Sequence, residues 1–253
     1  MQVAVLSDIH ANLPALEAVL REAGEVGAEE LWCLGDVIGY GASPDECVAL
    51  VAEHCDACLV GNHDLAVLGR LDASTFSTAA RTAVEWTAAN SSVESLEFLG
   101  GLHPADSTRV AALYHASPRD PVWEYVLWPE QAAECLIAQE SRVSFIGHSH
   151  VALFFSASED EGGDVGESSP PEARGWQAGA GTRLEIDEGR WLINPGSVGQ
   201  PRDGDPRAAW LELDTDSWQV TYHRVAYEID RAAGAIERAG LPAHLARRLF
   251  VGR

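Results

Sequence analysis

The chain contains no lysine, so all 17 of its basic residues are arginines, set against 39 acidic residues in a length of 253. Without lysine there is no Schiff-base chemistry on a lysine side chain and no P-loop lysine to bind phosphate. The formal net charge of −22 also disfavours duplex nucleic acid as a partner, because duplex binding depends on basic side chains that displace counterions from phosphates. A small anionic substrate remains compatible with this composition if its pocket supplies positive charge locally.

Cysteine is scarce as well. The five cysteines form an odd set that lacks the density of a disulfide-rich secreted domain: Cys33, Cys47, Cys55, Cys58 and Cys135. Cys55 and Cys58 have the spacing of half a zinc site, but there is no second cysteine pair to complete four ligands. We therefore expect reduced and mostly buried thiols.

Long apolar runs are missing too. No segment approaches the roughly 20 apolar residues that a membrane-spanning helix needs. A cleavable leader of ordinary length would remove Asp8 and His10, which are candidate ligands for a metal. We expect no membrane partner and a cytoplasmic location.

The first third of the chain alternates between strand and helix patterns. Apolar runs predict strands, and helical spacing predicts helices between them, over residues 2–7 (strand), 13–26 (helix), 30–34 (strand), 44 onward (helix) and 58–60 (strand). Asn12 is expected to cap the first helix, and Ser43, Pro44 and Glu46 form a start signal for the second. This alternation predicts a parallel βαβ sheet, in which ligands gather beyond the carboxyl ends of the strands.

The rest of the chain changes character after residue 150. Before that point the pattern predicts a helical stretch at 73–101, a strand at 110–115, a helix at 129–139 and a strand at 143–146. Short strands without helices between them follow, at 151–156, 183–186, 190–194, 208–213 and 219–225, which indicates antiparallel pairing. Residues 157–173 are polar and predict a flexible hairpin tip, and residues 227–253 predict two terminal helices, at 228–239 and 242–250. We expect one mixed α/β domain over residues 1–253.

Five turns, each directly after an apolar run, carry side chains that can bind a metal. They are Asp8-Ile9-His10, Gly35-Asp36, Gly61-Asn62-His63-Asp64, His115 and Gly147-His148-Ser149-His150. Taken alone, most of these turns would be ordinary solvated loops. Their joint occurrence, each behind a predicted strand, indicates a metal site.

The number and type of these residues suit two metal ions. A hydrolytic centre holds its ions roughly 3.5 to 4 Å apart and needs a bridging carboxylate, for which we predict Asp36. The other predicted ligands are Asp8, His10 and His150 for one ion, and Asn62, His115 and His148 for the other. A mixture of carboxylate, imidazole and amide groups suits Mn, Fe, Zn, Co or Ni, with Mn²⁺ preferred, better than Ca or Mg.

Charge and chemistry agree with this hypothesis. Two divalent ions, two carboxylates and a bridging hydroxide leave a local charge of about +1 on an acidic protein, where a phosphoryl group would bind. The ions would supply hydroxide as the nucleophile. His63 is not needed as a ligand, and we predict that it protonates the leaving alkoxide or stabilises the transition state, with Asp64 orienting its ring.

The ordered motifs resemble those of the calcineurin-like metallophosphoesterases, and the resemblance covers nearly the whole chain. Residues 194–199, Asn-Pro-Gly-Ser-Val-Gly, resemble the small prokaryotic branch related to YfcE-like phosphodiesterases and diadenosine tetraphosphatases. The resemblance implies a four-layer α/β/β/α sandwich of two mixed sheets flanked by helices, the same assignment of ligands, and His63 as the catalytic histidine. Residues 73–101 and 157–173 depart from the pattern, so the choice of substrate does not transfer.

Three further residues are candidates for binding the substrate. Tyr40 could stack on a base or simply pack within its loop. Arg119 and Arg202 could each bind a phosphate through two N–H groups, or form a salt bridge to the adjacent Asp120 or Asp203. We expect at least one of these arginines to face the pocket.

The leading functional hypothesis is a phosphoesterase that hydrolyses a phosphodiester or nucleotide-type small molecule by attack of a metal-bridging hydroxide. A phosphomonoesterase or a dinucleoside polyphosphate hydrolase is the alternative, since the same attack serves all three and only the pocket walls discriminate. A non-catalytic metal-binding scaffold is a different class. The retromer scaffold subunit resembles this family but lacks the catalytic histidine, which His63 supplies here. A protein phosphatase is less favoured because the surface is acidic and no docking segment is evident.

Overall fold

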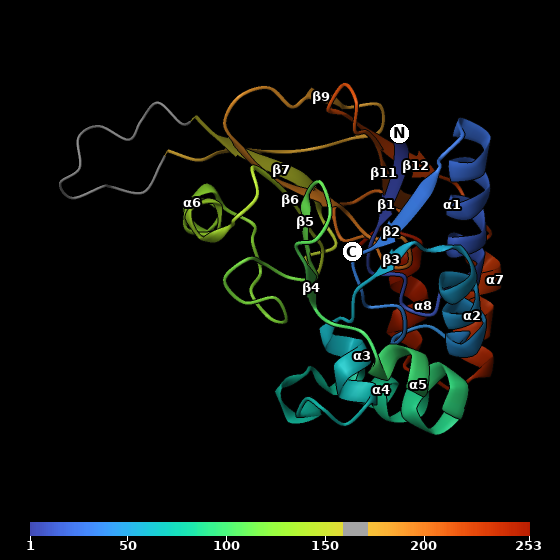
Figure 1. Cartoon of the computed structure of the whole chain (residues 1–253). Coiled ribbons are helices and arrows are strands. Elements are labelled where there is room, and N and C mark those ends of the chain that lie inside the picture. Colours follow the sequence, from blue (N-terminus) through green and yellow to red (C-terminus); the bar gives the residue numbers. More distant parts are fainter. Residues whose placement is uncertain (159–171) are drawn as a thin grey trace.

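The computed structural model describes residues 1–158 and 172–253, and these form two six-stranded sheets (Figure 1). In spatial order the first sheet contains β3 (Ala57–Cys58), β2 (Glu30–Cys33), β1 (Gln2–Leu6), β11 (Ala208–Asp214), β12 (Gln219–Val225) and β9 (Arg183–Glu185). The second contains β4 (Ala105–Asp106), β5 (Ala112–Tyr114), β6 (Val143–Ile146), β10 (Arg190–Pro195), β7 (Ala152–Ala157) and β8 (Arg174–Gln177).

Both sheets are mixed. In the first, β1, β2 and β3 are parallel, while β11, β12 and β9 add antiparallel pairs. In the second, β5, β6 and β10 are parallel, and β4, β7 and β8 pair antiparallel at either side. The expected change from a parallel first half to antiparallel strands is therefore present, although the later strands are divided between the two sheets.

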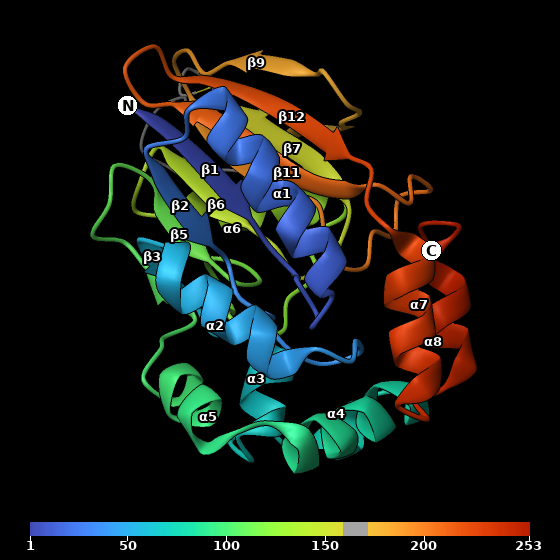
Figure 2. The ribbon, with the colours of Figure 1, turned by 90° about the vertical axis from the view of Figure 1, so that its right-hand side faces the viewer.

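Helices cover the outer face of each sheet. Helices α1 (Leu13–Val26) and α2 (Pro44–His54) pack on the first sheet, and α6 (Pro129–Ala138) packs on the second (Figures 1 and 2). The layers follow the order helix, sheet, sheet, helix, which confirms the predicted four-layer sandwich.

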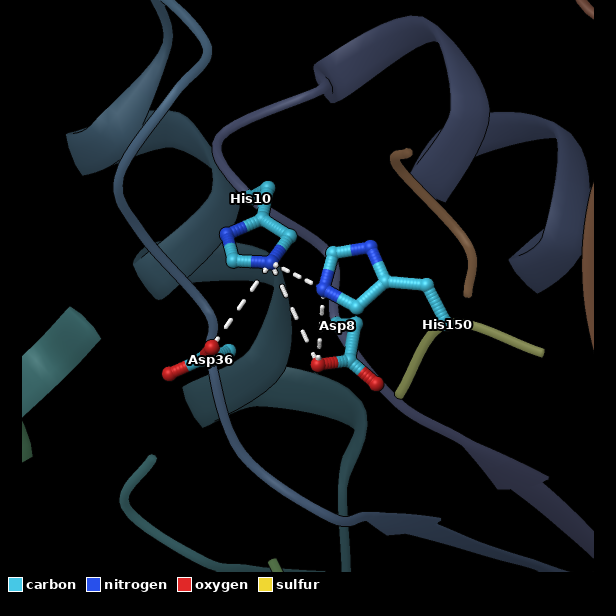
Figure 3. A group of neighbouring side chains, drawn as sticks. All are labelled: Asp8, His10, Asp36 and His150. Carbon is cyan, nitrogen blue, oxygen red and sulfur yellow. Dashed lines mark hydrogen bonds and ion pairs between the residues drawn. The ribbon is translucent and has the colours of Figure 1, made fainter. Parts of the chain in front are cut away.

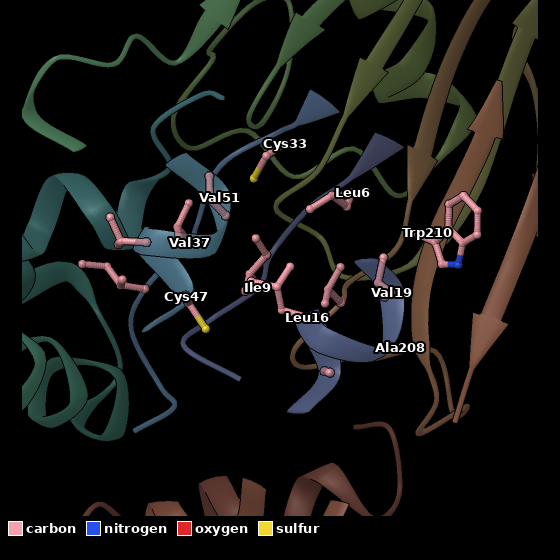
Figure 4. Close-up of a cluster of buried hydrophobic side chains, with 14 of the residues drawn as sticks. Leu6, Ile9, Leu16, Val19, Cys33, Val37, Cys47, Val51, Ala208 and Trp210 are labelled. Carbon is pink, nitrogen blue, oxygen red and sulfur yellow. The ribbon is translucent and has the colours of Figure 1, made fainter. Parts of the chain in front are cut away.

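Strand β1 shows how the sequence builds these layers. Successive side chains of a strand point to opposite faces. Val3 and Val5 accordingly lie in the apolar cluster between the sheets, while Ala4 and Leu6 lie in the cluster beneath α1 and α2. Figure 4 shows Leu6 in this second cluster. Leu16 of α1 is fully buried there, and such burial contributes about 1.5–3 kcal/mol per leucine.

The start of α1 is held by Asn12, as predicted. Its side-chain oxygen accepts a hydrogen bond from the backbone N–H of Ala15 at 3.3 Å. Its amide nitrogen donates to the backbone oxygen of Gly199 at 2.8 Å. One side chain thus caps the helix and joins the loop after β1 to the loop after β10.

The helical stretch predicted at 73–101 is divided into three pieces: η1 (Ala73–Thr75), α4 (Thr78–Asn90) and α5 (Val93–Gly100). The breaks occur where Ser77 and Ser92 act as N-caps and accept hydrogen bonds from the backbone N–H of Ala80 and Ser95. Serine competes with the helical backbone in this way, so it starts new helices here rather than continuing one.

Three short elements were not predicted from the sequence. These are α3 (Asn62–Val67), β4 and β8. The two-residue β4 is too short to show a periodic pattern. Helix α3 overlaps the turn at residues 61–64, which we had considered only as a source of metal ligands. Strands β7 and β8 pair antiparallel with Ser156 opposite Arg174, and most of the predicted hairpin tip, residues 159–171, lies outside the described residues.

The C-terminal helices α7 (Ile229–Arg238) and α8 (Ala243–Leu249) form a separate apolar cluster with α4 (Figure 2). Tyr40 and Trp86 pack against this cluster from the side. Over the described part of the chain, no helix combines the length and apolar character needed to cross a bilayer.

Candidate metal centre

The predicted metal ligands lie at the carboxyl ends of parallel strands. Asp8 and His10 follow β1, Asp36 follows β2, and Asn62 begins α3 just after β3. From the second sheet, His115 follows β5, and His148 and His150 follow β6. Because the two sheets pack face to face, these strand ends meet, and the seven side chains gather at one edge of the sandwich.

Four of these side chains form a compact group (Figure 3). The Nε2 atom of His10 lies 3.6 Å from Asp36 Oδ2 and 3.9 Å from Asp8 Oδ1. The Nε2 atom of His150 lies 3.4 Å from Asp8 Oδ1 and 3.1 Å from His10 Nε2. All four side chains are buried.

A second group shares Asp36 with the first and adds His115 and His148. The Nε2 atom of His115 lies 3.7 Å from Asp36 Oδ2 and 3.1 Å from Asn62 Oδ1. Asp36 therefore occupies the position that a bridging carboxylate would need, with potential ligands on both sides.

The hydrogen bonds of three histidines fix where their lone pairs point. The Nδ1 atoms of His10, His115 and His150 lie 3.2, 2.9 and 2.6 Å from the backbone oxygens of Ile38, Leu34 and Gln200. A carbonyl oxygen can only accept, so each Nδ1 must donate its proton and each neutral ring presents an unprotonated Nε2.

The contact between the Nε2 atoms of His10 and His150 then brings two lone pairs to 3.1 Å with no proton between them. This contact is repulsive unless a cation lies beside both atoms. Histidines that bind metals are held in this manner, with the other ring nitrogen donating to the backbone.

The orphaned atoms of the site also fit a metal. Asp8 Oδ1, Asp36 Oδ2 and His148 Nε2 are buried and have no hydrogen-bond partner within the described residues. An unpaired buried charge is costly, whereas coordination satisfies it. Ligands about 2.0–2.2 Å from a common ion lie roughly 3–3.5 Å apart, and the observed separations of 3.1 to 3.9 Å are close to that range.

The backbone at the site is strained. Positive φ values, which non-glycine residues rarely adopt, occur at Asp8 (55°), His10 (51°), Asp36 (52°), His148 (62°) and His150 (58°). Such conformations cost about 1–3 kcal/mol each and cluster at functional sites. Five of the seven predicted ligands are thus held in positions that the rest of the fold must stabilise.

Two glycines of the motifs are required by close approach. A Cβ atom on Gly61 would collide with the carboxylate of Asp36, and one on Gly147 would collide with the side chain of Ser7 and approach Asp8. The glycines therefore let neighbouring loops come together around the carboxylates.

The motif at residues 194–199 holds the ligand loops in place. Asn194 donates from Nδ2 to the backbone oxygen of Gly147 at 2.7 Å and to Ser149 Oγ at 3.0 Å. Ser197 donates from Oγ to the backbone oxygen of Asp8 at 2.8 Å. This support of the metal loops gives the motif a structural role that its sequence alone did not reveal.

Asp64 lies elsewhere than predicted relative to His63. Its carboxylate accepts from the backbone N–H of Gly61 at 2.9 Å, Ile38 at 3.0 Å and Val37 at 3.3 Å. No hydrogen bond joins it to the His63 ring in the described residues, where His63 Nδ1 has no partner. Asp64 thus organises the loops after β2 and β3 rather than orienting His63.

His63 is buried at the rim of the centre. Its ring centroid lies 4.9 Å from that of His10 and 4.3 Å from that of Tyr40. Its backbone N–H donates to Asp36 Oδ1 at 2.8 Å. The ring belongs to neither group of potential ligands, so it lies beside the centre while its backbone helps fix Asp36.

The three candidate substrate residues differ in their surroundings. Arg202 is joined to a loop of the candidate metal centre, because its backbone N–H donates to the backbone oxygen of His150 at 3.0 Å. Its Nη2 atom lies 3.5 Å from Tyr40 Oη. Arg119 forms ion pairs with Glu124 at 3.5 Å and with Glu134 at 3.3 Å, so its guanidinium group is already paired with two carboxylates.

An aromatic rim completes the site, and two of its residues, Phe76 and Tyr125, were not predicted from the sequence. The Tyr125 ring lies 4.1 Å from that of His148, and the Trp123 ring lies 6.3 Å from it. The Phe76 ring centroid lies 5.0 Å from that of His63 and 5.2 Å from that of Trp123. Phe76 comes from one segment and Trp123 and Tyr125 from another, so only the fold reveals that the three rings lie together.

In the absence of metal, burial is the main cause of the shifted pKa values of the site residues. It raises the pKa of Asp8 to about 7 and, together with the charge of Asp64, raises the pKa of Asp36 well above its usual range. Burial also lowers the pKa of three histidines well below the usual range of an imidazole: His10, His148 and His150. These three rings are therefore neutral at pH 7.

These shifts predict that metal affinity falls as the pH falls below 7. A metal binds the carboxylate form of Asp8, so below its folded pKa of about 7 binding must release a proton. The dissociation constant for Mn²⁺ should rise by about tenfold or more per pH unit between pH 6.5 and 5.5. Calorimetric titration in buffers of different ionisation enthalpy would measure the proton release; an affinity unchanged between pH 5.5 and 7.5 would contradict it.

The chain is similar to several known proteins. The profile of the calcineurin-like phosphoesterase superfamily domain matches residues 1–216. An uncharacterized protein of Methanocaldococcus jannaschii is 36% identical over 99% of this chain and 98% of its own length. The crystal structure of a metallophosphoesterase from Sphaerobacter thermophilus is 40% identical, covers 100% of this chain and 99% of its own, and has a TM-score of 0.86. A hypothetical protein of Pyrococcus horikoshii shares the fold with a TM-score of 0.75 at 18% identity, covering 100% of this chain and 98% of its own.

Proposed function

Given that the chain belongs to the calcineurin-like phosphoesterase superfamily, we propose that it uses two divalent cations to hydrolyse a phosphodiester or nucleotide-type small molecule. The family and its buried Asp/His cluster make it a metallophosphoesterase with a candidate metal site. One observation carries the rest of the proposal: Asp36 is common to two groups of buried potential ligands whose lone pairs converge.

The chemistry of the donor set supports this assignment. Divalent cations held by these residues would provide Lewis acidity toward a phosphoryl oxygen and would lower the pKa of a water molecule toward neutrality. The mixture of imidazole, carboxylate and one amide favours Mn²⁺ among the transition metals, with Fe, Zn, Co or Ni as alternatives.

His63 is the side chain best placed to act on the leaving group. Burial and the positive charge of Arg202 lower its pKa well below the usual range, so the ring is neutral in the free protein at pH 7. A bound phosphate would counter that effect, because a nearby negative charge favours the imidazolium form. His63 would then donate a hydrogen bond or a proton to the departing oxygen.

The presence of His63 beside the ligands favours an enzyme over a non-catalytic scaffold. A scaffold has no use for a buried imidazole that lies outside the ligand set and has an unpartnered Nδ1 in the described structure. A phosphomonoesterase or a dinucleoside polyphosphate hydrolase remains the alternative activity, since the same centre serves each substrate.

We also place the protein in the cytoplasm. All five cysteines are free thiols in the structure, and three of them are buried: Cys33, Cys47 and Cys135. A reducing compartment keeps such thiols in this form.

A colorimetric assay tests the proposed activity. We expect the purified protein with Mn²⁺ to release nitrophenolate from bis(p-nitrophenyl) phosphate, and chelation to stop the reaction. The His244→Ala variant replaces an exposed histidine on α8, so it should retain full activity and serves as the control for the His63→Ala variant. No turnover of this diester or of p-nitrophenyl phosphate with any of Mn, Fe, Zn, Co and Ni would contradict the proposal.

A further inference from the structure

His63 is held differently from the histidines that are candidate metal ligands. In His10, His115 and His150 the Nδ1 atom donates to a backbone carbonyl oxygen, which fixes the orientation of the ring. The Nδ1 atom of His63 is buried and has no hydrogen-bond partner within the described residues. The carboxylate of Asp64 accepts from backbone N–H groups instead. The orientation of the His63 ring therefore depends on how it is packed.

Two aromatic side chains pack against this ring. The Tyr40 ring centroid lies 4.3 Å from that of His63, with 48° between the ring planes. The Phe76 ring centroid lies 5.0 Å from that of His63, and the two rings meet edge to face at 89°. Aromatic pairs favour such tilted and edge-to-face arrangements. Tyr40 belongs to the loop after β2 and Phe76 to the segment between η1 and α4, so two separate parts of the chain meet at His63.

The backbone of the Tyr40 loop also lies against the His63 ring. A Cβ atom on Gly39 would be 2.7 Å from His63 Nδ1, so a larger residue would displace the ring. On the other side of Tyr40, the backbone N–H of Gly41 donates to the backbone oxygen of His10 at 3.1 Å, and a Cβ atom on Gly41 would collide with that oxygen. The loop at residues 39–41 is thus fixed in place and closes one side of the His63 ring.

Phe76 is anchored independently of the metal centre. Its side chain packs against the apolar cluster beneath α1 and α2. Just before it, the carboxylate of Asp72 accepts from the backbone N–H of Ser74 at 2.8 Å and holds η1. Just after it, Ser77 caps α4 by accepting from the backbone N–H of Ala80 at 3.3 Å. Phe76 therefore offers His63 a surface whose own position is fixed.

The two aromatic side chains differ in what else they contact. The Tyr40 ring centroid lies 4.7 Å from that of His10, which is a candidate ligand. Within the described part of the chain, the Phe76 ring contacts the rings of His63 and Trp123 but that of no candidate ligand. A change at Phe76 therefore acts on His63 without acting directly on the metal centre.

We propose that Phe76 is a positioning residue for His63, and that with Tyr40 it forms an aromatic clamp that holds the imidazole in the orientation from which it meets the leaving group. This role depends on the phosphoesterase function and on the part of His63 proposed above. It gives a task in the reaction to the segment at residues 73–101, which departs from the family pattern. Displacing a catalytic group by about 1 Å can cost about a hundredfold in rate, so packing alone can control what His63 does.

A double-mutant cycle tests the clamp on an alkyl phosphodiester, whose leaving group needs a proton. Phe76→Ala should lower kcat by about tenfold or more while KM and metal content stay unchanged. Phe76→Tyr keeps the ring and should restore kcat to within about twofold of the wild type. In a His63→Ala background, Phe76→Ala should have no further effect, because the group that it positions is gone. A loss of equal size in both backgrounds overturns the proposal.

Phe98→Ala is the matched control. Phe98 is half-buried against the same apolar cluster as Phe76, but no aromatic contact joins it to His63 in the described residues. It should lower the melting temperature as Phe76→Ala does and keep the wild-type kcat. Equal losses of kcat in these two variants would make the effect of Phe76 one of stability and would overturn its positioning role.

Nuclear magnetic resonance tests the orientation of His63 without requiring turnover. The protein is labelled with ¹³C-histidine and loaded with diamagnetic Zn²⁺, and the His63 ring signal is identified by its absence from His63→Ala. The wild type and Phe76→Tyr should give a sharp signal with nuclear Overhauser contacts to the Tyr40 ring, and Phe76→Ala should broaden the signal or weaken these contacts. Phe76→Leu, which is apolar but lacks the flat ring, replaces Phe76→Ala if that variant does not fold.

The two measurements separate the clamp from the phosphoesterase function. An unchanged His63 signal with unchanged contacts to Tyr40 in a folded Phe76→Ala or Phe76→Leu protein overturns the clamp, whether or not the wild type is active. Absence of turnover by the wild type contradicts the phosphoesterase function, and the His63 signal still decides whether Phe76 holds the ring.

Discussion

Replacing Asp36 by alanine should reduce hydrolysis by at least about a thousandfold and should also lower the bound metal, because one carboxylate serves both groups of potential ligands. Its Oδ2 atom lies 3.6 Å from His10 Nε2 and 3.7 Å from His115 Nε2, so its removal opens both sites at once. Elemental analysis after dialysis against Mn²⁺, together with kcat on a chromogenic diester, measures both effects.

The Asp36→Asn variant separates charge from shape. Its side-chain oxygen can still accept from the His63 N–H, which lies 2.8 Å from Asp36 Oδ1, but the negative charge is gone. We expect it to fold like the wild type and to lose metal nearly as severely as Asp36→Ala. Asp230→Ala, an exposed carboxylate at the start of α7, is the control and should retain two equivalents of metal. Full metal content in both Asp36 variants would show that this residue is not the bridge.

Replacing His63 by alanine should lower kcat by about a hundredfold to ten-thousandfold while leaving the metal content unchanged. The reason is positional, because the ring lies beside the centre at 4.9 Å from the His10 ring but belongs to neither ligand group. Steady-state kinetics and elemental analysis on the same preparation separate this outcome from that of the Asp36 variants.

The leaving group distinguishes how His63 acts. A general acid matters most when the departing oxygen is basic. The loss caused by His63→Ala should therefore be larger for an alkyl phosphodiester than for a nitrophenyl one, whose leaving group departs without a proton. Equal losses for the two esters would assign His63 an electrostatic role instead, and a loss of metal in this variant would place it among the ligands.

The sequence was sufficient to predict where the candidate site lies, and the physical reason is simple. Asp8, Asp36 and His148 each follow a short apolar strand, and parallel strands present their carboxyl ends at the same edge. The structure adds that Gly61 and Gly147 lie so close to the neighbouring loops that a Cβ atom would collide there, with the Asp36 carboxylate and with the Ser7 side chain.

The sequence did not predict which strands join which of the two sheets. Strand β10 joins the second sheet and β11 the first, although they are neighbours in the sequence and carry similar apolar patterns. Local propensity does not decide between such partners, because the choice depends on which faces are buried together. The family resemblance, rather than the strand pattern, predicted the correct layer order.

The walls of the site could not be predicted because they depend on distant segments. Phe76 is far in the sequence from Trp123 and Tyr125, and Leu249 of α8 lines a cavity with His10 only in the folded structure. Asp64 looked like a partner for His63 from its place in the chain. It instead satisfies three backbone N–H groups, which required the course of the neighbouring loops to be known.

The most direct test of the metal centre is anomalous diffraction from crystals soaked in Mn²⁺. Two anomalous peaks should appear, one among Asp8, His10, Asp36 and His150 and the other among Asp36, Asn62, His115 and His148, with Asp36 in contact with both. A single peak would contradict the two-ion arrangement. No peak among these residues, with manganese in the soaking solution, would contradict the metal centre altogether.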